Sequence, residues 1–219
     1  MEKEALKRIF DFLEGKENKI HKDKDKFIWK LKFNETLTKE ELNVKGDLDL
    51  EFAKITSLPE GLKVSGFLSL RETNITSLPE DLKVGGGLDL RNCKKITSLP
   101  KGLEVGKYLW LAETNITSLP EGLEVGGSLD LNNSKITSLP KGLKVFGYLD
   151  LSYSEIKSLP EGLEVSGELD LTDTELTSLP KGLKVGGNLD TTYTPLAKYT
   201  YDELIEMIKP GFIKGEIYN

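Results

Sequence analysis

The sequence predicts a β-dominated solenoid: a parallel β coil with strands on two sides and helical or strand caps at both ends. The prolines give the first indication, because seven of the nine fall in one column with a spacing of 20 residues and a single step of 21. Each stands inside a copy of one unit whose leucines cannot be buried by that copy alone. Stacking such copies on one another buries them. The seven prolines are Pro59, Pro79, Pro100, Pro120, Pro140, Pro160 and Pro180.

The repeated unit, written from its first leucine, reads L-x-L-x-x-T-x-I-x-S-L-P-x-G-L-x-V-x-G-x. Seven copies span residues 48–188, and a degenerate eighth begins at Leu189. Residues 1–47 are therefore expected to form an N-terminal cap, and residues 189–219 the eighth repeat with a C-terminal cap. The third copy has one extra residue within the segment 91–95, which predicts a loop insertion. The copies begin at Leu48, Leu68, Leu88, Leu109, Leu129, Leu149 and Leu169.

Two strands are expected in each turn. Positions 1 and 3 are apolar around a polar position 2, which is typical of a strand with one buried face. A Leu-x-Val pair at positions 15 and 17, such as Leu62 and Val64, predicts a second, shorter strand on the other side. Neighbouring turns would pair in parallel at about 4.8 Å. The proline at position 12 suits a corner, where no ladder N–H is needed.

The repeat resembles the leucine-rich repeat family in its short bacterial and phage-encoded type, of about 20 residues per turn. The segment Ile75-Thr76-Ser77-Leu78-Pro79, followed by Leu82-Lys83-Val84, carries the resemblance, which covers about two-thirds of the chain. It implies a solenoid whose strand face holds other proteins. That family usually places Asn after the strand, whereas this column holds small residues whose hydroxyls can do part of the same work. They are Ala53, Thr73, Cys93, Thr114, Ser134, Ser154, Thr174 and Thr194.

The two ends depart from the repeat, as the caps of a solenoid must. Near the N-terminus, Ala5, Leu6, Ile9, Phe10 and Leu13 form a helical stripe. A charged loop follows, and alternating apolar residues from Phe27 to Phe33 predict a strand. At the other end, Thr200 and Glu203 form a capping box before a helix that Pro210 ends. Phe212, Ile213 and Ile217 predict a short closing strand.

Composition excludes several functional classes. The net charge is −6 and the pI about 5.1, which argues against direct nucleic-acid binding. No apolar run is long enough to cross a bilayer and the first residues lack the apolar core of a signal peptide, so we expect a cytoplasmic protein without a membrane partner. One histidine, His21, and one cysteine, Cys93, leave no zinc site or disulfide framework. We expect His21 in a solvated loop and Cys93 as a structural thiol. We therefore expect no enzyme, no catalytic residue, no metal and no cofactor.

Charged residues recur in register along the coil. From the fourth copy onward, positions 13 and 16 alternate in sign between neighbouring turns, which predicts inter-turn ion pairs: they read Glu121 and Glu124, Lys141 and Lys144, Glu161 and Glu164, Lys181 and Lys184. Position 2, outward on the first strand, carries six aspartates, which would form an acidic stripe. The stripe has two interpretations, protection against aggregation or a surface for a basic partner. Its column reads Asp49, Ser69, Asp89, Trp110, Asp130, Asp150, Asp170 and Asp190.

Trp110 interrupts this stripe and marks the candidate binding site. Tyr108 flanks it on the same strand, and Arg71 and Arg91 stand at position 4 of preceding turns, with Phe146 and Tyr153 close in register. Exposed Trp, Tyr and Arg together are typical of an interface hot spot. Alternatively, the aromatic residues pack against the N-terminal segment or fill turn corners. The predicted protein-binding residues are Phe67, Arg71, Asp89, Arg91, Tyr108, Trp110, Asp130, Tyr148 and Asp150.

The leading hypothesis is a non-enzymatic module that binds another protein through the outward strand face. The alternative is an acidic mimic, such as a phage-type inhibitor, that occupies a basic nucleic-acid-binding protein. A third hypothesis, an ice- or surface-binding array, would use the threonine column at position 9, which Lys157 interrupts.

Overall fold

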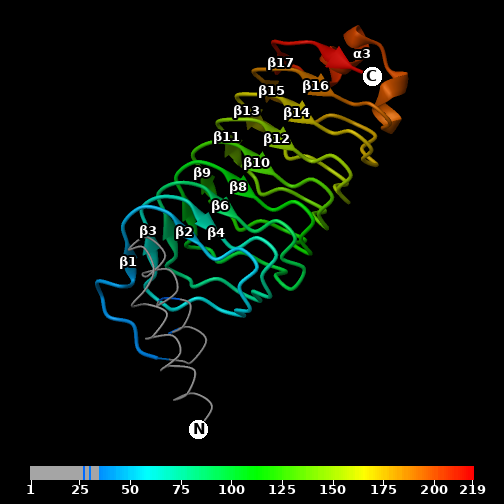
Figure 1. Cartoon of the computed structure of the whole chain (residues 1–219). Helices are drawn as coiled ribbons and strands as arrows, with labels where there is room; N and C mark the ends of the chain where they lie inside the picture. The colour runs from blue at the N-terminus through cyan, green and yellow to red at the C-terminus, as the bar shows by residue number, and fades with distance from the viewer. Residues whose placement is uncertain (1–26, 28–29, 31–34) are drawn as a thin grey trace.

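A computed structural model describes residues 27, 30 and 35–219. It is a parallel β-solenoid with a repeat of about 20 residues, in which each turn adds one strand to each of two sheets (Figure 1). We call these sheets A and B. Their strands are two residues long, so most of each turn is corner and loop.

Sheet A is formed at positions 16 and 17 of the repeat, where the Leu-x-Val pair predicted the shorter strand. Its nine parallel strands follow one another in chain order. They are β1 (Asn43–Val44), β3 (Lys63–Val64), β5 (Lys83–Val84), β7 (Glu104–Val105), β9 (Glu124–Val125), β11 (Lys144–Val145), β13 (Glu164–Val165), β15 (Lys184–Val185) and β17 (Phe212–Ile213).

Sheet B is formed at positions 1 and 2 and also has nine parallel strands in chain order. They are β2 (Leu48–Asp49), β4 (Leu68–Ser69), β6 (Leu88–Asp89), β8 (Leu109–Trp110), β10 (Leu129–Asp130), β12 (Leu149–Asp150), β14 (Leu169–Asp170), β16 (Leu189–Asp190) and β18 (Ile217–Tyr218).

The turns stack in register, so residues at the same position of successive repeats lie next to one another in the structure. Leu109 is aligned with Leu129, and Leu129 with Leu149. The leucines at positions 1 and 3 and the valines at position 17 are buried in one continuous core along the coil. Positions 20, 2 and 4 of sheet B therefore point outward, which confirms the predicted alternation.

The corner after sheet B has a left-handed backbone at position 5 in every turn, although no glycine stands there. The next residue closes the corner, as Thr114 does by donating its N–H and its Oγ1 to the carbonyl of Leu111 at 3.3 and 2.7 Å. The hydroxyls of Thr114, Ser154, Thr174 and Thr194 thus bind their own turn, whereas Thr73 Oγ1 contacts Cys93 Sγ of the next turn. The left-handed residues are Phe52, Glu72, Asn92, Glu113, Asn133, Tyr153, Asp173 and Tyr193.

The extra residue of the third turn forms a small turn at residues 94–95, as predicted. Residues that are aligned across this turn are 21 positions apart in the chain, as Lys83 is from Glu104 and Asp89 from Trp110. Asn115 Nδ2 donates to Lys94 O at 2.6 Å and ties the insertion to the following turn. Both sheets continue past it without interruption.

The C-terminal end is covered by a 3₁₀ helix, η1 (Pro195–Lys198), and by α3 (Tyr201–Ile208), which lie beside the last strands (Figure 1). The predicted capping box of Thr200 and Glu203 is present, and Leu204 and Ile208 are buried. Strands β17 and β18 then extend both sheets by one place. Among the described residues, no helix has the length and apolar character needed to cross a bilayer.

The strand predicted from Phe27 to Phe33 is wrong at both positions that the structure describes. Phe27 and Lys30 are helical, with Phe27 buried in the core and Lys30 Nζ 2.6 Å from Glu41 Oε1. A short apolar run does not distinguish a strand from a helix by periodicity alone, which explains the error. The helix predicted over residues 5–13 and the loop containing His21 lie outside the described residues.

Candidate functional site

The indole of Trp110 is the centre of an aromatic cluster on the outward face of sheet B. Its ring lies 5.5 Å from the ring of Phe67, edge to face at 61°, and 5.9 Å from the ring of Tyr108, stacked at 15°. The guanidinium carbon of Arg91 lies 4.6 Å from the centroid of the indole. We call Phe67, Arg91, Tyr108, Trp110 and Tyr148 the Trp110 cluster.

A glycine makes the meeting of Phe67 and Trp110 possible. Phe67 and Tyr108 share one outward column but are separated by two turns, about 9.6 Å, with Gly87 between them. A Cβ atom at Gly87 would lie only 3.0 Å from Phe67 Cδ2 and 3.2 Å from Tyr108 O. The bare backbone therefore lets the ring of Phe67 lie over this turn and reach the indole.

Asp89 holds Arg91 in place over the indole. Arg91 donates its Nε to Asp89 Oδ1 at 3.0 Å and its Nη2 to Oδ2 at 2.6 Å, and this bonding raises the pKa of Arg91. The carboxylate is only 3% exposed. Asp89 was predicted as a binding residue, but both of its carboxylate oxygens already accept hydrogen bonds from Arg91. Its role in the site is therefore to position Arg91. Bidentate pairs of this kind restrict the arginine to one orientation.

Tyr148 joins the cluster from the C-terminal side. Burial raises the pKa of its hydroxyl, as does the nearby charge of Asp130, while a hydrogen bond with Trp110 opposes the rise. Burial likewise raises the pKa of Asp130, against the opposing hydrogen bond from the N–H of Asn132. Tyr148 and Tyr108 nevertheless remain 41% and 44% exposed. The cluster therefore presents partly exposed rings beside a partly buried carboxylate.

The remaining predicted residues lie at the margins of the cluster. Arg71 stands one turn before Arg91 and lies 3.2 Å from Glu51 and 3.5 Å from Glu72. Asp150 follows Asp130 in the stripe and is aligned with it across β10 and β12. The nine predicted residues therefore occupy one continuous part of sheet B.

The aspartates of position 2 have a structural role that sequence reasoning missed. Each accepts, through Oδ1, a hydrogen bond from the backbone N–H two residues later, where the chain leaves the sheet. Aspartate is favoured in turns for this bond, so its position just before the corner was the available signal. The donors and acceptors are Glu51 to Asp49, Arg91 to Asp89, Asn132 to Asp130, Ser152 to Asp150, Thr172 to Asp170 and Thr192 to Asp190.

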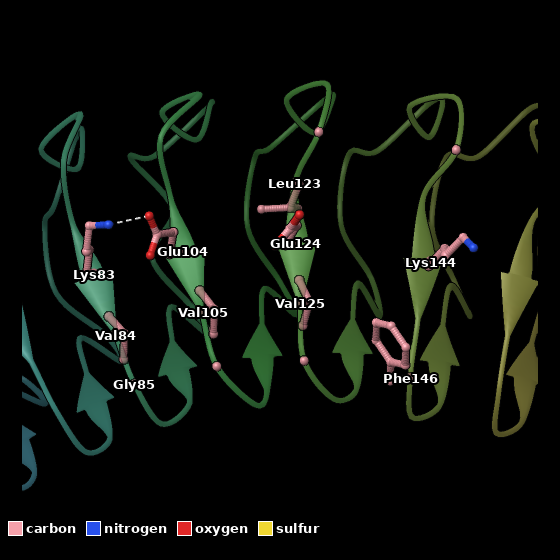
Figure 2. A pocket seen from close by; sticks show the side chains of 14 residues that line it. Lys83, Val84, Gly85, Glu104, Val105, Leu123, Glu124, Val125, Lys144 and Phe146 are labelled. Atoms are coloured by element: carbon pink, nitrogen blue, oxygen red, sulfur yellow. Dashed lines mark hydrogen bonds and ion pairs between the residues drawn. The ribbon is translucent and has the colours of Figure 1, made fainter.

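Phe146 and Tyr153 do not join the Trp110 cluster. Tyr153 occupies a left-handed corner and is exposed. Phe146 stands one residue past β11, where it lines a shallow groove over the outward face of sheet A with a volume of ≈ 630 Å³ (Figure 2). Sequence register placed Phe146 near the cluster because it ignored the bend of the chain between the two sheets.

The outward face of sheet A carries two of the three inter-turn ion pairs predicted at position 16, whereas Glu124 and Lys144 form none among the described residues. Glu164 lies 3.2 Å from Lys144 and 2.8 Å from Lys184, and Lys83 pairs with Glu104. At position 13, the described part of the chain shows no such pairs, although alternating charges predicted them there as well.

Within the described ranges, no group of three histidine, cysteine or acidic side chains could hold a metal ion. Cys93 is fully buried, donates its thiol to the carbonyl of Leu70 at 3.0 Å and contacts Thr73 Oγ1 at 3.5 Å. Burial raises the pKa of the thiol. This environment suits a packing residue and disfavours the reactive thiolate.

A comparison of the chain with protein-family models finds no match, and a comparison with curated proteins also finds none.

Proposed function

We propose that this protein is a non-enzymatic interaction module that binds another protein through the outward face of sheet B, centred on the Trp110 cluster. One observation carries the proposal: a polar sheet face keeps three aromatic side chains partly exposed around Trp110, with Arg91 stacked on the indole. The repeat itself does not require this arrangement, since aspartate fills the same position in six other turns.

The composition of the cluster supports the proposal. Trp, Tyr and Arg are enriched among the residues that contribute most to protein–protein binding. The contacts of Trp110 with Phe67 and Tyr108, and of Arg91 with Asp89, restrain these side chains before any partner arrives. A restrained surface loses little conformational entropy on binding. The resemblance to leucine-rich repeats supports the same use of a strand face.

The charges around the cluster suggest the chemistry of the partner. Asp130 and Asp150 lie on its C-terminal side, and the described structure gives neither of them an ion-pair partner. The surface that fits would combine an apolar centre for the indole with basic groups opposite these carboxylates. Complementary charge of this kind raises the association rate and restricts the choice of partner.

The test is capture of a partner from the source cell by wild type and by Trp110→Asp. Aspartate is the residue of this column in most turns, and its carboxylate can accept the N–H of Ala112, so the variant should fold. We expect capture to be lost while the thermal unfolding temperature stays within a few degrees of wild type. Tyr201→Ser serves as the control, because it removes an exposed aromatic residue from α3, away from the Trp110 cluster. Equal capture by wild type and Trp110→Asp would reject the proposal.

The second candidate function is an acidic mimic that occupies a nucleic-acid-binding protein. It is supported by the four consecutive aspartates from Asp130 to Asp190, aligned turn by turn along sheet B. It predicts binding that weakens steeply with added salt and is lost in the double variant Asp130→Asn, Asp150→Asn. The loss of binding on Trp110→Asp alone, with little salt dependence, would favour the first proposal.

A further inference from the structure

The groove over sheet A is built differently from the rest of that face. It extends over β5, β7, β9 and β11, and Phe146 stands at one end of it (Figure 2). Position 18 of the repeat, just after each strand, is glycine in three consecutive turns of the groove, at Gly85, Gly106 and Gly126. No side chain of this column covers the sheet until Phe146.

These glycines are required by the close approach of successive turns. A Cβ atom would lie 2.5 Å from Ser65 O at Gly85, 2.2 Å from Gly85 O at Gly106, and 2.1 Å from Gly106 O at Gly126. A side chain at any of the three would force the preceding backbone to move. The floor of the groove is therefore bare peptide over two inter-turn steps, about 9.6 Å.

One carboxylate of the groove forms no ion pair among the described residues. Lys83 pairs with Glu104, and Lys144 lies beside Glu164 in the following turn. Glu124 has Glu104, a like charge, as its aligned neighbour on one side, and on the other side Lys144, which pairs with Glu164 instead. In the part of the chain that the structure describes, Glu124 has no ion pair. The groove thus carries an exposed carboxylate without an ion pair above its glycine floor (Figure 2).

Phe146 provides an aromatic face at the same place. It is 64% exposed, and its ring lies on the β9 side of β11 (Figure 2). Two other turns carry serine in its column, at Ser65 and Ser166. An exposed phenylalanine is therefore not needed to build the turn, and it lies one turn from the carboxylate of Glu124.

We propose that this groove binds an arginine side chain from an extended segment of a partner protein. The guanidinium is planar, pairs with a carboxylate through two hydrogen bonds and stacks on aromatic rings. Glu124 would accept these hydrogen bonds, Phe146 would stack against the cation, and the glycine floor would accommodate the flat group and its aliphatic stem. The proposal concerns sheet A alone, so it does not depend on the function proposed for sheet B.

The test is titration of the ¹⁵N-labelled protein with the peptide acetyl-Gly-Arg-Gly-Arg-Gly-amide, followed through the amide resonances of Gly106 and Gly126. We expect saturable shifts at these glycines with a dissociation constant in the millimolar range. Glu124→Gln and Phe146→Ser should each weaken binding roughly threefold, as expected for an exposed ion pair or cation–π contact. Glu161→Gln, which changes an exposed glutamate outside the groove, is the matched control and should bind as wild type does.

Three outcomes would overturn the proposal. The first is the absence of saturable shifts at Gly106 and Gly126, and the second is equal binding by wild type, Glu124→Gln and Phe146→Ser. The third is a set of shifts confined to sheet B around Asp130 and Asp150, which would show that the peptide recognises the acidic stripe. A peptide with citrulline in place of arginine should produce no shifts, since citrulline has the same length but no charge.

Discussion

The outward faces of sheets A and B are built from one repeat but hold their acidic residues in two different ways. On sheet A, glutamates at position 16 pair with lysines of neighbouring turns, as Glu164 does with Lys144 and Lys184. On sheet B, aspartates at position 2 accept a hydrogen bond from their own backbone two residues later. The acidic residues of sheet A therefore find their partners only if an adjacent turn carries a lysine. Those of sheet B find their partner within their own turn.

This difference explains where the repeat can vary. A charge on sheet A can be exchanged with little effect on the backbone, and the column at position 16 indeed contains both signs. At position 2 of sheet B, replacement of aspartate removes an acceptor from the corner. Trp110 is one of the two exceptions in the seven full repeats, and its side chain contacts neighbouring rings instead of the corner backbone.

The largest expected effect comes from the core that both faces share. Leu129→Ala, at a fully buried position of sheet B, should lower the free energy of unfolding by about 2–5 kcal/mol. Val125→Ala, the corresponding change under sheet A, removes one methylene fewer and should cost about 0.8 kcal/mol less. Urea unfolding followed by circular dichroism measures both. A larger loss for Val125→Ala would show that sheet A contributes more to the core than its burial indicates.

The second prediction compares the two kinds of carboxylate directly. Asp150→Ala removes the acceptor of both the N–H and the hydroxyl of Ser152, and should lower the free energy of unfolding by about 1–2 kcal/mol. Glu164→Ala breaks two exposed ion pairs and should produce a change too small to resolve. The same urea experiment compares the two variants. Similar losses in both would remove the distinction between the faces.

The third prediction concerns the pH dependence of the two faces. Burial raises the pKa of Asp130 and Asp150, whereas hydrogen bonds and charges from Lys184 and Lys144 lower the pKa of Glu164. A carboxyl with a raised pKa in the folded protein contributes stability at low pH that is lost as pH rises through that pKa. A carboxyl with a lowered pKa contributes stability at neutral pH that is lost as pH falls through it.

Carbon-detected NMR titration of the side-chain carboxyls measures these pKa values one residue at a time. As pH falls from neutral, Asp130 and Asp150 should take up protons above the ordinary aspartate range, and Glu164 should do so only below the ordinary glutamate range. The reverse order would contradict the assignment of buried carboxylates to sheet B and solvated ion pairs to sheet A.

A small stabilising effect is expected at the corner that follows sheet B. Tyr193 is 79% exposed and has a left-handed backbone with φ of 60°, which asparagine adopts more readily than tyrosine. Tyr193→Asn should therefore raise the free energy of unfolding by a few tenths of a kcal/mol, up to about 1. Thermal unfolding provides the measurement, with Tyr201→Asn as a control at an exposed helical position. Destabilisation by Tyr193→Asn would show that the tyrosine ring makes contacts that outweigh its backbone strain.

The fold could be predicted from the sequence because every turn must bury apolar residues at the same positions of the repeat. Leu, Ile and Val recur at fixed positions, and a slip of one residue would expose them all, so the register of both sheets follows from the spacing. The capping box of α3 was also visible, since it depends on two nearby residues. The helical state of Phe27 was not, because a short apolar run lacks a decisive period.

The candidate site could be predicted only in part. The columns located Trp110, Tyr108 and Tyr148 on one face, because strand register alone determines these neighbours. The hydrogen bonds between Arg91 and Asp89 depend on the conformations of the two side chains, which the alignment of the repeats does not reveal. Phe146 was placed on the wrong face because a position just beyond a strand follows the bend of the loop.

The extra residue at the corner of the third turn has a practical consequence. The chain absorbs it at residues 94–95 while both sheets continue in register on either side. This corner is therefore a site where additional residues can be inserted. A peptide tag or a second domain inserted between Lys94 and Lys95 would project from the side of the coil and leave the faces of both sheets uncovered.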